Sequence, residues 1–390
     1  MANEDRATRY HRLRRRASLL GTGLGALLLI ALLLSGASAT LRDLARSIAG
    51  DSFFPAILVY VVLLALLSEA LQLPLAFYQG VTLERRYGLS TQTTAAWWRD
   101  HFKAGGLALV FAPAGALIVW SLLRWAPAYW WLIAAACFSG ILLVLAQLAP
   151  VLLFPLFYEF KPLDRPTLVR RLVSLADRAG AQVLGVFELR LSDRTRKANA
   201  ALAGMGRTRR ILLSDTLLSG HSDDEIEVIL AHELAHHVHG DIWKGMALET
   251  ALITLGFYLA DRVLTAFASP LGLEGKSDVA GLPLLLLTGG AVSVALLPLA
   301  NALSRAHERR ADRYALEMTD NADAFVTAMK RLAAQNLAEE HPSRIVEMLF
   351  HSHPSMSSRI AAAHAWASDA ARTVTPRLRS GPAVRHTSSS

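Results

Sequence analysis

The 390-residue sequence contains only one cysteine, Cys137, and few charged side chains. A single cysteine excludes intrachain disulfides and any zinc or iron–sulfur site that needs several thiolates. Asp, Glu, Lys and Arg make up 18% of the residues, whereas soluble globular proteins carry about 25%. Hydrophobic residues make up 53%, which excludes a disordered chain, because disorder requires low hydrophobicity. The composition therefore disfavours an ordinary soluble enzyme and favours a membrane protein.

The sequence contains several long apolar runs with few or no charged residues. A helix that crosses the hydrocarbon core of a membrane needs about 20 apolar residues. Six runs predict such helices, at 17–41, 52–83, 104–123, 127–158, 248–269 and 279–304. The first is too long for the apolar part of a signal peptide and others follow it, so we expect a membrane anchor. The fifth is the weakest, because Glu249, Asp261 and Arg262 interrupt it.

The distribution of basic residues predicts the orientation of these helices. Cytoplasmic segments of membrane proteins carry an excess of Lys and Arg near the membrane. Residues 1–16 contain six arginines, and 84–103, 159–244 and the chain after Arg305 are also rich in Arg and Lys. We therefore expect both termini and the polar block after residue 159 to be cytoplasmic. The net charge of +8 then reflects this asymmetry, and we expect no nucleic-acid partner.

The polar block has the pattern of a small unit that mixes helices and strands. An amphipathic helix pattern occurs at 166–179, and strand patterns occur at 183–191, 192–207 and 209–213, the middle one read as a turn plus an edge strand. Ser222 and Glu225 form the capping-box pattern of a helix start, and Gly240 suits the end of that helix. The block therefore predicts a small β-sheet beside a well-defined helix.

The most specific signal lies in that helix, where the sequence reads His232-Glu233-Leu234-Ala235-His236. Residues four apart share one face of a helix, so both imidazoles can reach one metal ion. In HExxH motifs the ion is zinc, and the glutamate takes a proton from the attacking water. We therefore predict one catalytic Zn²⁺ per chain, bound by His232 and His236, with Glu233 as the general base.

A catalytic zinc site needs a third protein ligand and one open position. Metzincins would supply a third histidine at a position that is Ile242 here. His237 and His239 lie nearby, but His237 points about 100° away from the preceding histidine around a helix. A better candidate is Glu308, four residues before Asp312 on one helical face, where the last apolar run ends. Glu308 would be the third ligand, and Asp312 would orient an imidazole by accepting its distal N–H.

Several landmarks occur in a fixed order along the chain, at 73–74, 84–93, 155–163, 199–200, 214–217, 232–236, 304–312, 353–354 and 359–360. This ordered set resembles the type I CAAX prenyl proteases, which are membrane zinc endopeptidases of the gluzincin kind. The resemblance covers roughly residues 55–365 and implies the same zinc ligands and base. It also implies that Asn199 binds the substrate backbone along an edge strand, that Arg305 braces the site and that His353 stabilises the oxyanion. The family typically has seven membrane helices around a chamber, and the sequence shows six.

We therefore predict a mainly α, polytopic membrane protein of about six spans with a cytoplasmic gluzincin-type zinc metallopeptidase domain that contains a small β-sheet. The expected parts are a basic cytoplasmic N-terminus (1–16), a four-span membrane domain (17–158), a metallopeptidase domain that includes the last two spans (159–367) and a polar, disordered tail (368–390). The substrate would be a peptide or protein that is lipidated or membrane-associated. The Ala-, Arg- and Leu-rich composition is typical of bacteria, so we expect the bacterial inner membrane.

Two alternative functions share part of this pattern. A quality-control zinc protease for membrane proteins would also have an HExxH motif and a distal glutamate. A metal-binding transporter or channel is favoured slightly by Glu69, because carboxylates inside membrane spans are often functional. A transport site does not need a glutamate directly after its first histidine, so the sequence favours a peptidase.

Overall fold

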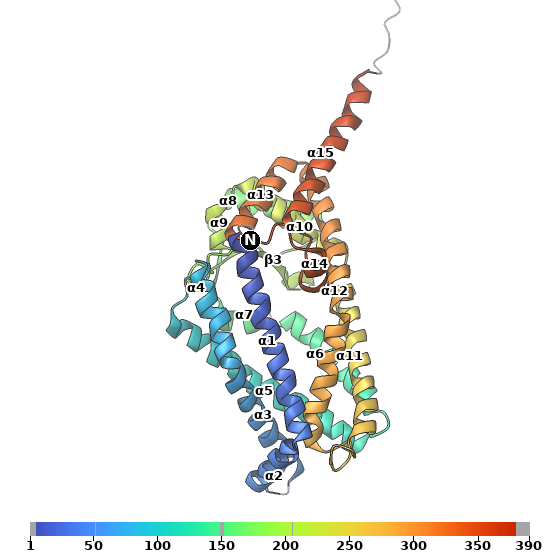
Figure 1. Ribbon diagram of the computed structural model, residues 1–390. Coiled ribbons are helices and arrows are strands. Elements are labelled where there is room, and N and C mark those ends of the chain that lie inside the picture. Colours follow the sequence, from blue (N-terminus) through green and yellow to red (C-terminus); the bar gives the residue numbers. More distant parts are fainter. Residues whose placement is uncertain (1–4, 51, 149–151, 205, 380–390) are drawn as a thin grey trace, which may run out of the picture.

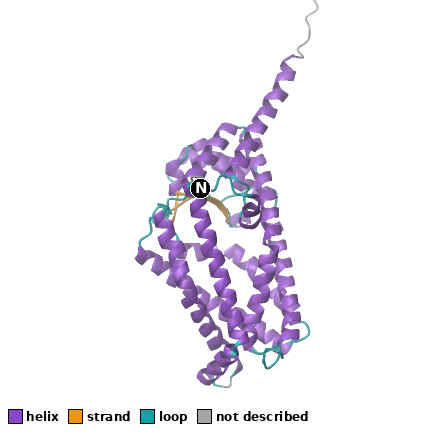
Figure 2. Ribbon diagram, in the orientation of Figure 1, coloured by secondary structure: helices purple, strands orange, loops and turns teal. Residues whose placement is uncertain are grey.

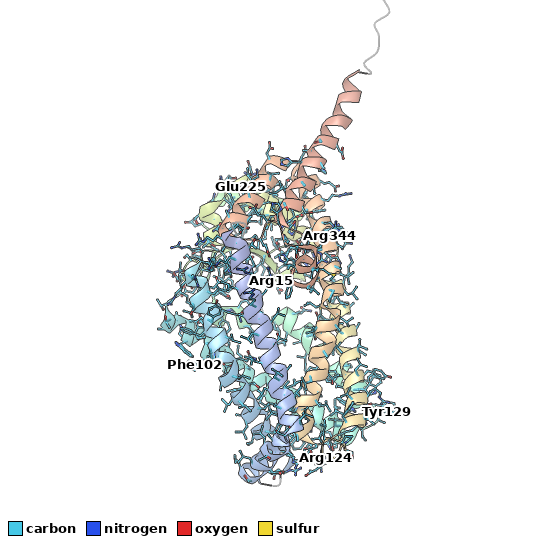
Figure 3. The ribbon with its side chains drawn as sticks, viewed as in Figure 1. Arg15, Phe102, Arg124, Tyr129, Glu225 and Arg344 are labelled. Atoms are coloured by element: carbon cyan, nitrogen blue, oxygen red, sulfur yellow. The ribbon has the colours of Figure 1, made fainter. Side chains whose placement is uncertain are left out.

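The structure, a computed structural model, describes residues 5–50, 52–148, 152–204 and 206–379. Long helices form a bundle in the lower part of Figure 1, and shorter helices surround a small sheet in the upper part (Figure 2). Figure 3 places Arg124 and Tyr129 at the far end of the bundle, away from Glu225 and Arg344 in the upper part. The upper part, formed by residues 160–238 and 305–379, is called the α/β unit below.

Within the described residues, six helices are long and apolar enough to cross a membrane. They are α1 (Arg6–Leu34), α3 (Phe53–Phe77), α5 (Thr94–Trp125), α6 (Trp130–Leu148), α11 (Asp241–Phe267) and α12 (Leu282–Thr319). Helix α3 continues through a π-helical turn, η1 (Tyr78–Leu83), into α4 (Glu84–Arg86). Tyr60, Trp120 and Trp130 are fully buried in the apolar cluster that packs these helices together. The predicted polytopic α-helical fold is confirmed.

The first helix differs from the expected one at both ends. It begins at Arg6, inside the basic segment that was expected to precede the span, and Asp5 caps it by accepting an amide hydrogen bond of 2.8 Å. It ends at Leu34 instead of residue 41, because Gly36 adopts a left-handed φ of 76° that ends a helix. The following residues form a separate amphipathic helix, α2 (Ala37–Ala49), which packs against α3.

Two other apolar runs also end differently from the expected spans. The run at 127–158 contains α6, which ends at Leu148, and a separate short helix, α7 (Phe154–Phe157). Helix α12 continues past residue 304 to Thr319, so its 38 residues extend about 57 Å at 1.5 Å per residue. Hydrophobicity alone does not reveal this extension, because the residues after 304 are polar but good helix formers. One helix therefore joins the membrane bundle to the α/β unit.

A four-stranded sheet lies in the α/β unit, as predicted. Its strands are β1 (Phe160–Pro162), β2 (Val186–Leu189), β3 (Ala200–Ala203) and β4 (Arg210–Ser214), in the order β1-β2-β4-β3. Strands β2 and β4 are parallel, and the other two pairs are antiparallel. The edge strand β3 falls inside the segment where an edge strand was expected. Strand β1 was not predicted, because three residues show no alternation.

Helix α10 (Asp223–Val238) lies in the middle of the α/β unit. Both hydrogen bonds of the expected capping box are present: Ser222 Oγ accepts from the Glu225 amide, and the Glu225 carboxylate accepts from the Ser222 amide (2.7 Å). The helix packs against α12, α13 (Ala322–Asn336) and α8 (Pro166–Arg178). Its buried apolar residues are Ile226, Val228, Ile229, Leu230, Ala231, Leu234 and Ala235.

The C-terminal segment contradicts part of the expected disordered tail. Helix α15 (Met356–Arg379) includes residues 368–379, because this Ala-rich stretch favours a helix despite its polarity. Residues 380–390 of the expected tail lie outside the described residues. The remaining short helices are α9 (Asp215–Gly220), η3 (Gly206–Thr208), η4 (Val279–Gly281) and α14 (Arg344–Phe350).

Candidate metal centre

Helix α10 places both histidines of the HExxH motif on one face in the interior of the α/β unit. The centroids of the His232 and His236 rings lie 5.1 Å apart, and His232 is only 7% exposed. Leu234 on the opposite side of the helix and Ala235 beside the histidine face are fully buried. Core packing of these apolar residues fixes the rotation of α10, and this rotation directs both imidazoles toward α12.

Helix α12 supplies a carboxylate at the point where both imidazoles converge. His232 Nε2 lies 3.2 Å from Glu308 Oε2, and His236 Nε2 lies 3.4 Å from Glu308 Oε1. Ligand atoms held about 2.1 Å from a zinc ion at tetrahedral angles lie about 3.4 Å from one another. Among the described residues, these three form the only group of at least three His, Cys, Asp or Glu side chains suited to hold a metal ion.

Glu308 Oε2 gives a second indication that the site fits a metal. This oxygen is buried and lies close to His232 Nε2 (3.2 Å) and His353 Nδ1 (2.8 Å), yet neither contact meets the angles of a good hydrogen bond. Buried polar atoms normally have a partner, since leaving one unpaired costs about 1–3 kcal/mol. Two histidines and one carboxylate are also the ligand set of several catalytic zinc sites. The residues present therefore fit a catalytic divalent metal ion.

Burial and neighbouring charges set the proton affinity of these groups. Burial would lower the pKa of His232, but its close contacts with the carboxylates of Asp312 and Glu308 outweigh this effect and raise the pKa to about 9. Burial would likewise lower the pKa of His236, and the hydrogen bond with Glu308 raises it overall. Burial raises the pKa of Glu233, although the charges of the two histidines oppose this shift. A glutamate with a raised pKa is better suited to accept a proton near neutral pH.

Each imidazole has a carboxylate at its other nitrogen. His232 Nδ1 lies 2.9 Å from Asp312 Oδ1, as expected for the orienting role of Asp312. His236 Nδ1 lies 3.1 Å from Asp241 Oδ2, a contact that the sequence analysis missed. The signal that could have found Asp241 is Gly240, whose left-handed φ of 65° turns the chain back directly after α10.

Arg359 is the second residue of this site that sequence reasoning did not assign. Its Nε donates to Asp312 Oδ2 at 2.9 Å, its Nη2 donates to Oδ1 at 2.5 Å, and the side chain is buried. A two-point ion pair of this kind fixes the plane of the carboxylate that holds His232. The sequence analysis included Arg359 in one of the segments that resemble the family but gave it no role, because no local sequence pattern shows that α15 packs against α12.

The remaining predicted site residues occupy different places. His353 Nδ1 lies 2.8 Å from Glu308 Oε2, and its side chain is 59% exposed. His232, His236 and Glu308 are called the candidate metal-ligating group below. Arg305 does not touch this group; its Nη1 donates to the carbonyls of Glu347 (2.9 Å) and His351 (2.7 Å). Asn199 directly precedes β3; its amide donates to Ser214 Oγ (2.9 Å), and its carbonyl accepts from the Ser214 amide (2.9 Å).

A cleft of about 360 Å³ connects these elements. One side of the cleft is lined by Ala200 of the edge strand and by Asn199 directly before it. The other side, near the candidate metal centre, is lined by Glu233, His353 and Arg359. His11 of α1 also lines the cleft, so the first membrane helix forms part of its wall. The outer edge of β3 has no partner strand in the sheet, so its backbone can pair with an extended peptide.

The chain matches two family models over nearly its whole length. Residues 162–367 match peptidase family M48, and residues 2–159 match the CAAX prenyl protease N-terminal model, described as five membrane helices. The chain belongs to peptidase family M48. This M48 peptidase is a membrane metalloendopeptidase, as predicted, and the family favours this activity over the transporter or channel considered above. Four of its six apolar helices lie within 2–159, together with the shorter α2.

Similar proteins come from bacteria and eukaryotes. The uncharacterized metalloprotease YhfN of Bacillus subtilis is 32% identical over 358 residues, which cover 91% of this chain and 84% of YhfN. CAAX prenyl protease 1 of Saccharomyces cerevisiae is 29% identical, with coverage of 78% and 71%. The crystal structure of S. mikatae Ste24p superposes with a TM-score of 0.82 at 23% identity, covering 92% of this chain and 88% of that one, and therefore shows the fold.

Proposed function

We propose that this M48 peptidase is a zinc endopeptidase that cleaves lipidated or membrane-associated proteins at the cytoplasmic face of a bacterial inner membrane. The observation that carries the proposal is the convergence of His232, His236 and Glu308 beside Glu233, a residue that itself lines the cleft. The activity named for the similar yeast protein, a CAAX prenyl protease, supports a substrate that is held at the membrane. The basic segments near the spans support the cytoplasmic side.

The ligands and the base divide the chemistry between them. His232, His236 and Glu308 would hold one Zn²⁺ per chain, which when bound lowers the pKa of a water molecule and polarises the scissile carbonyl. Glu233 takes the proton of the attacking water and passes it to the leaving amine nitrogen as the peptide bond breaks. Asp312 keeps His232 oriented throughout, because Arg359 holds its carboxylate in place.

The cleft supplies the groups that bind the substrate. An extended segment would pair with the free edge of β3, and the Asn199 side chain at the start of this strand would bind its backbone. His353 would donate a hydrogen bond to the oxygen of the scissile carbonyl as negative charge develops there. Arg305 positions the segment that carries His353 by holding the carbonyls of Glu347 and His351.

A substrate-trapping experiment tests this function. Glu233→Gln keeps the zinc ligands but removes the base, so we expect normal metal content and peptide turnover lower by about 10²–10⁴-fold. Membrane proteins retained by the purified variant would be identified by mass spectrometry. Glu317→Gln, which changes an exposed glutamate on α12, is the matched control and should cleave normally and retain little.

The outcomes separate the substrate classes. Enrichment of lipidated C-terminal segments would support the proposal, whereas a diverse set of misfolded membrane proteins would assign the quality-control function instead. Near-normal turnover by Glu233→Gln would contradict the role of this residue as the base. Retention of soluble proteins alone would contradict a substrate held at the membrane.

A further inference from the structure

One face of α12 carries a row of basic residues just beyond its apolar segment. These residues line an open groove of about 540 Å³ on this helix. The basic side chains that line the groove are His307, Arg309, Arg310 and Arg313, and Leu303 and Ala306 complete its lining. None of these side chains belongs to the metal-ligating group, so the groove is separate from the peptide cleft.

Beside this groove, the buried Asp241 carboxylate is surrounded by more positive charge than it can neutralise. Asp241, with a side chain only 6% exposed, presents Oδ1 to Arg310 Nη2 (2.8 Å), Lys244 Nζ (3.4 Å) and His307 Nδ1 (3.6 Å). Arginine and lysine therefore already contribute two positive charges against one negative charge. The exposed Arg309 and Arg313 also line the groove, and on their other side they share a second pocket with Glu317 and Asp369. An anion that can accept two hydrogen bonds from one arginine, such as a phosphate, would suit this arrangement.

The surroundings place the groove at the level of the lipid headgroups. Below it, α12 exposes Leu299 and Leu303, and the adjacent start of α11 exposes Ile242 and Trp243, the latter to 57%. Tryptophan is enriched where the hydrocarbon of a membrane meets water. Basic pockets beside membrane helices bind the headgroups of anionic lipids. Apolar surface below and cationic surface above therefore match a lipid better than a soluble anion.

We propose that this groove binds the phosphate of an anionic phospholipid such as phosphatidylglycerol, through Lys244, Arg310 and the neighbouring arginines of α12. The proposal rests on the membrane location of the protein and not on its substrate. It also connects the lipid to the metal centre, because Asp241 Oδ2 accepts from His236 Nδ1 at 3.1 Å. A phosphate that draws Arg310 and Lys244 away leaves Asp241 a stronger acceptor, which holds His236 more firmly as a ligand.

Native mass spectrometry of the full-length protein in detergent would measure lipid retention directly. The probes are phosphatidylglycerol and phosphatidylcholine with the same acyl chains. We expect wild type to retain phosphatidylglycerol preferentially. Each neutralised cation should lower this preference by about fivefold, so Lys244→Gln/Arg310→Gln should lower it by about 25-fold.

Two further variants separate lipid binding from effects on folding or on the metal. Arg309→Gln/Arg313→Gln lowers the charge of the groove without touching Asp241, so its zinc content should be normal while lipid preference falls about 25-fold. Arg99→Gln is the matched control, because Arg99 is 66% exposed on another membrane helix, α5. It should retain phosphatidylglycerol as wild type does.

Three results would overturn the proposal. Equal retention of both lipids by wild type would show that charge does not select the ligand, and equal losses in Arg99→Gln would show a general surface effect. Competition by soluble glycerol phosphate at the same concentration would show a site for a free phosphate. None of these readouts needs peptidase activity, so failure here is distinguishable from failure of the proposed protease function.

Discussion

At the residue scale, each imidazole of the candidate metal centre has a carboxylate from another segment at its second nitrogen. His232 is held by Asp312 and His236 by Asp241, so that Nε2 of both rings points to the same place. Such contacts fix the tautomer and strengthen the imidazole as a ligand. The two carboxylates differ, because buried Arg359 holds Asp312, whereas surface cations surround Asp241. The His236 side is therefore the more adjustable half of the site.

The first prediction at this scale concerns the third ligand. Glu308→Ala should lower zinc affinity by more than the roughly 10–100-fold cost of losing an outer hydrogen-bond partner, because a direct ligand is removed. His237→Ala is the matched control, since His237 lies outside the metal-ligating group, and its zinc content should be unchanged. Elemental analysis of the dialysed proteins checks both. Full occupancy in Glu308→Ala together with loss in His237→Ala would reverse the ligand assignment.

The second prediction follows from the pKa of His232. In metal-free protein this pKa is raised to about 9, so the imidazole is protonated at neutral pH, and zinc must displace that proton to bind. Apparent zinc affinity should therefore rise about tenfold per pH unit between pH 7 and 9 and level off above. Competition with a chelator, corrected for the chelator's own protonation, measures this slope.

The control for this pH dependence is Asp312→Asn. Asp312 is one of the partners that raise the pKa of His232, and an amide cannot replace its charge. The rise in affinity should then level off at a lower pH than in wild type. A wild-type affinity that is independent of pH over this range would contradict a protonated His232.

At the element scale, the sequence predicts what local patterns determine. Helix α10 could be located from its capping box and from the spacing of its histidines, both of which lie within one short segment. The small sheet and the edge position of β3 could be expected from alternation and glycines. The ends of α1 and α12 could not be predicted, because hydrophobicity marks only the part of a helix inside the membrane and not where the helix begins or ends.

Contacts between elements were the part of the site that sequence patterns could not supply. Asp241 reaches His236 because Gly240 reverses the chain, and Arg359 reaches Asp312 because α15 packs along α12. Both depend on tertiary packing between segments whose relative position no local pattern encodes. Arg305 shows the same limit, since a basic residue at a membrane boundary gives no sign that it holds the carbonyls of Glu347 and His351.

At the scale of the whole molecule, membrane helices and the α/β unit form one connected body. Helix α12 extends from the bundle to the metal-ligating group, and α1 reaches the same unit from the N-terminal side. Arg15, labelled in Figure 3, pairs with Glu339 at 2.5 Å, and His11 Nε2 lies 2.9 Å from the Leu337 carbonyl. Because α1 also lines the peptide cleft, the membrane domain helps to shape the site where the substrate binds.

The orientation of this body is the last prediction, and it depends on α11, the weakest apolar run in the sequence. The structure accounts for Asp261, one of the charges that interrupt this run: it is buried at the far end of the bundle, where it accepts from Trp130 Nε1 (2.7 Å) and pairs with Lys276 (3.0 Å). Helix α11 can therefore cross the membrane, and the loop after it should lie opposite the α/β unit. In a Cys137→Ser background, an impermeant maleimide applied to spheroplasts should label Ser277→Cys, which is exposed in that loop.

The matching probe on the other side is His341→Cys, in the exposed loop between α13 and α14. It should react only after the membrane is permeabilised, because the excess of Arg and Lys beside the spans favours the cytoplasm for the α/β unit. Labelling of His341→Cys alone in sealed spheroplasts would mean that the orientation is reversed. Protection of both residues would mean that α11 and α12 enter and leave the membrane from one side. The proposed metal ligands lie on α10 and α12. A reversed orientation would therefore place the proposed peptide cleavage on the other side of the membrane, and a re-entrant pair would change how α12 lies in the membrane.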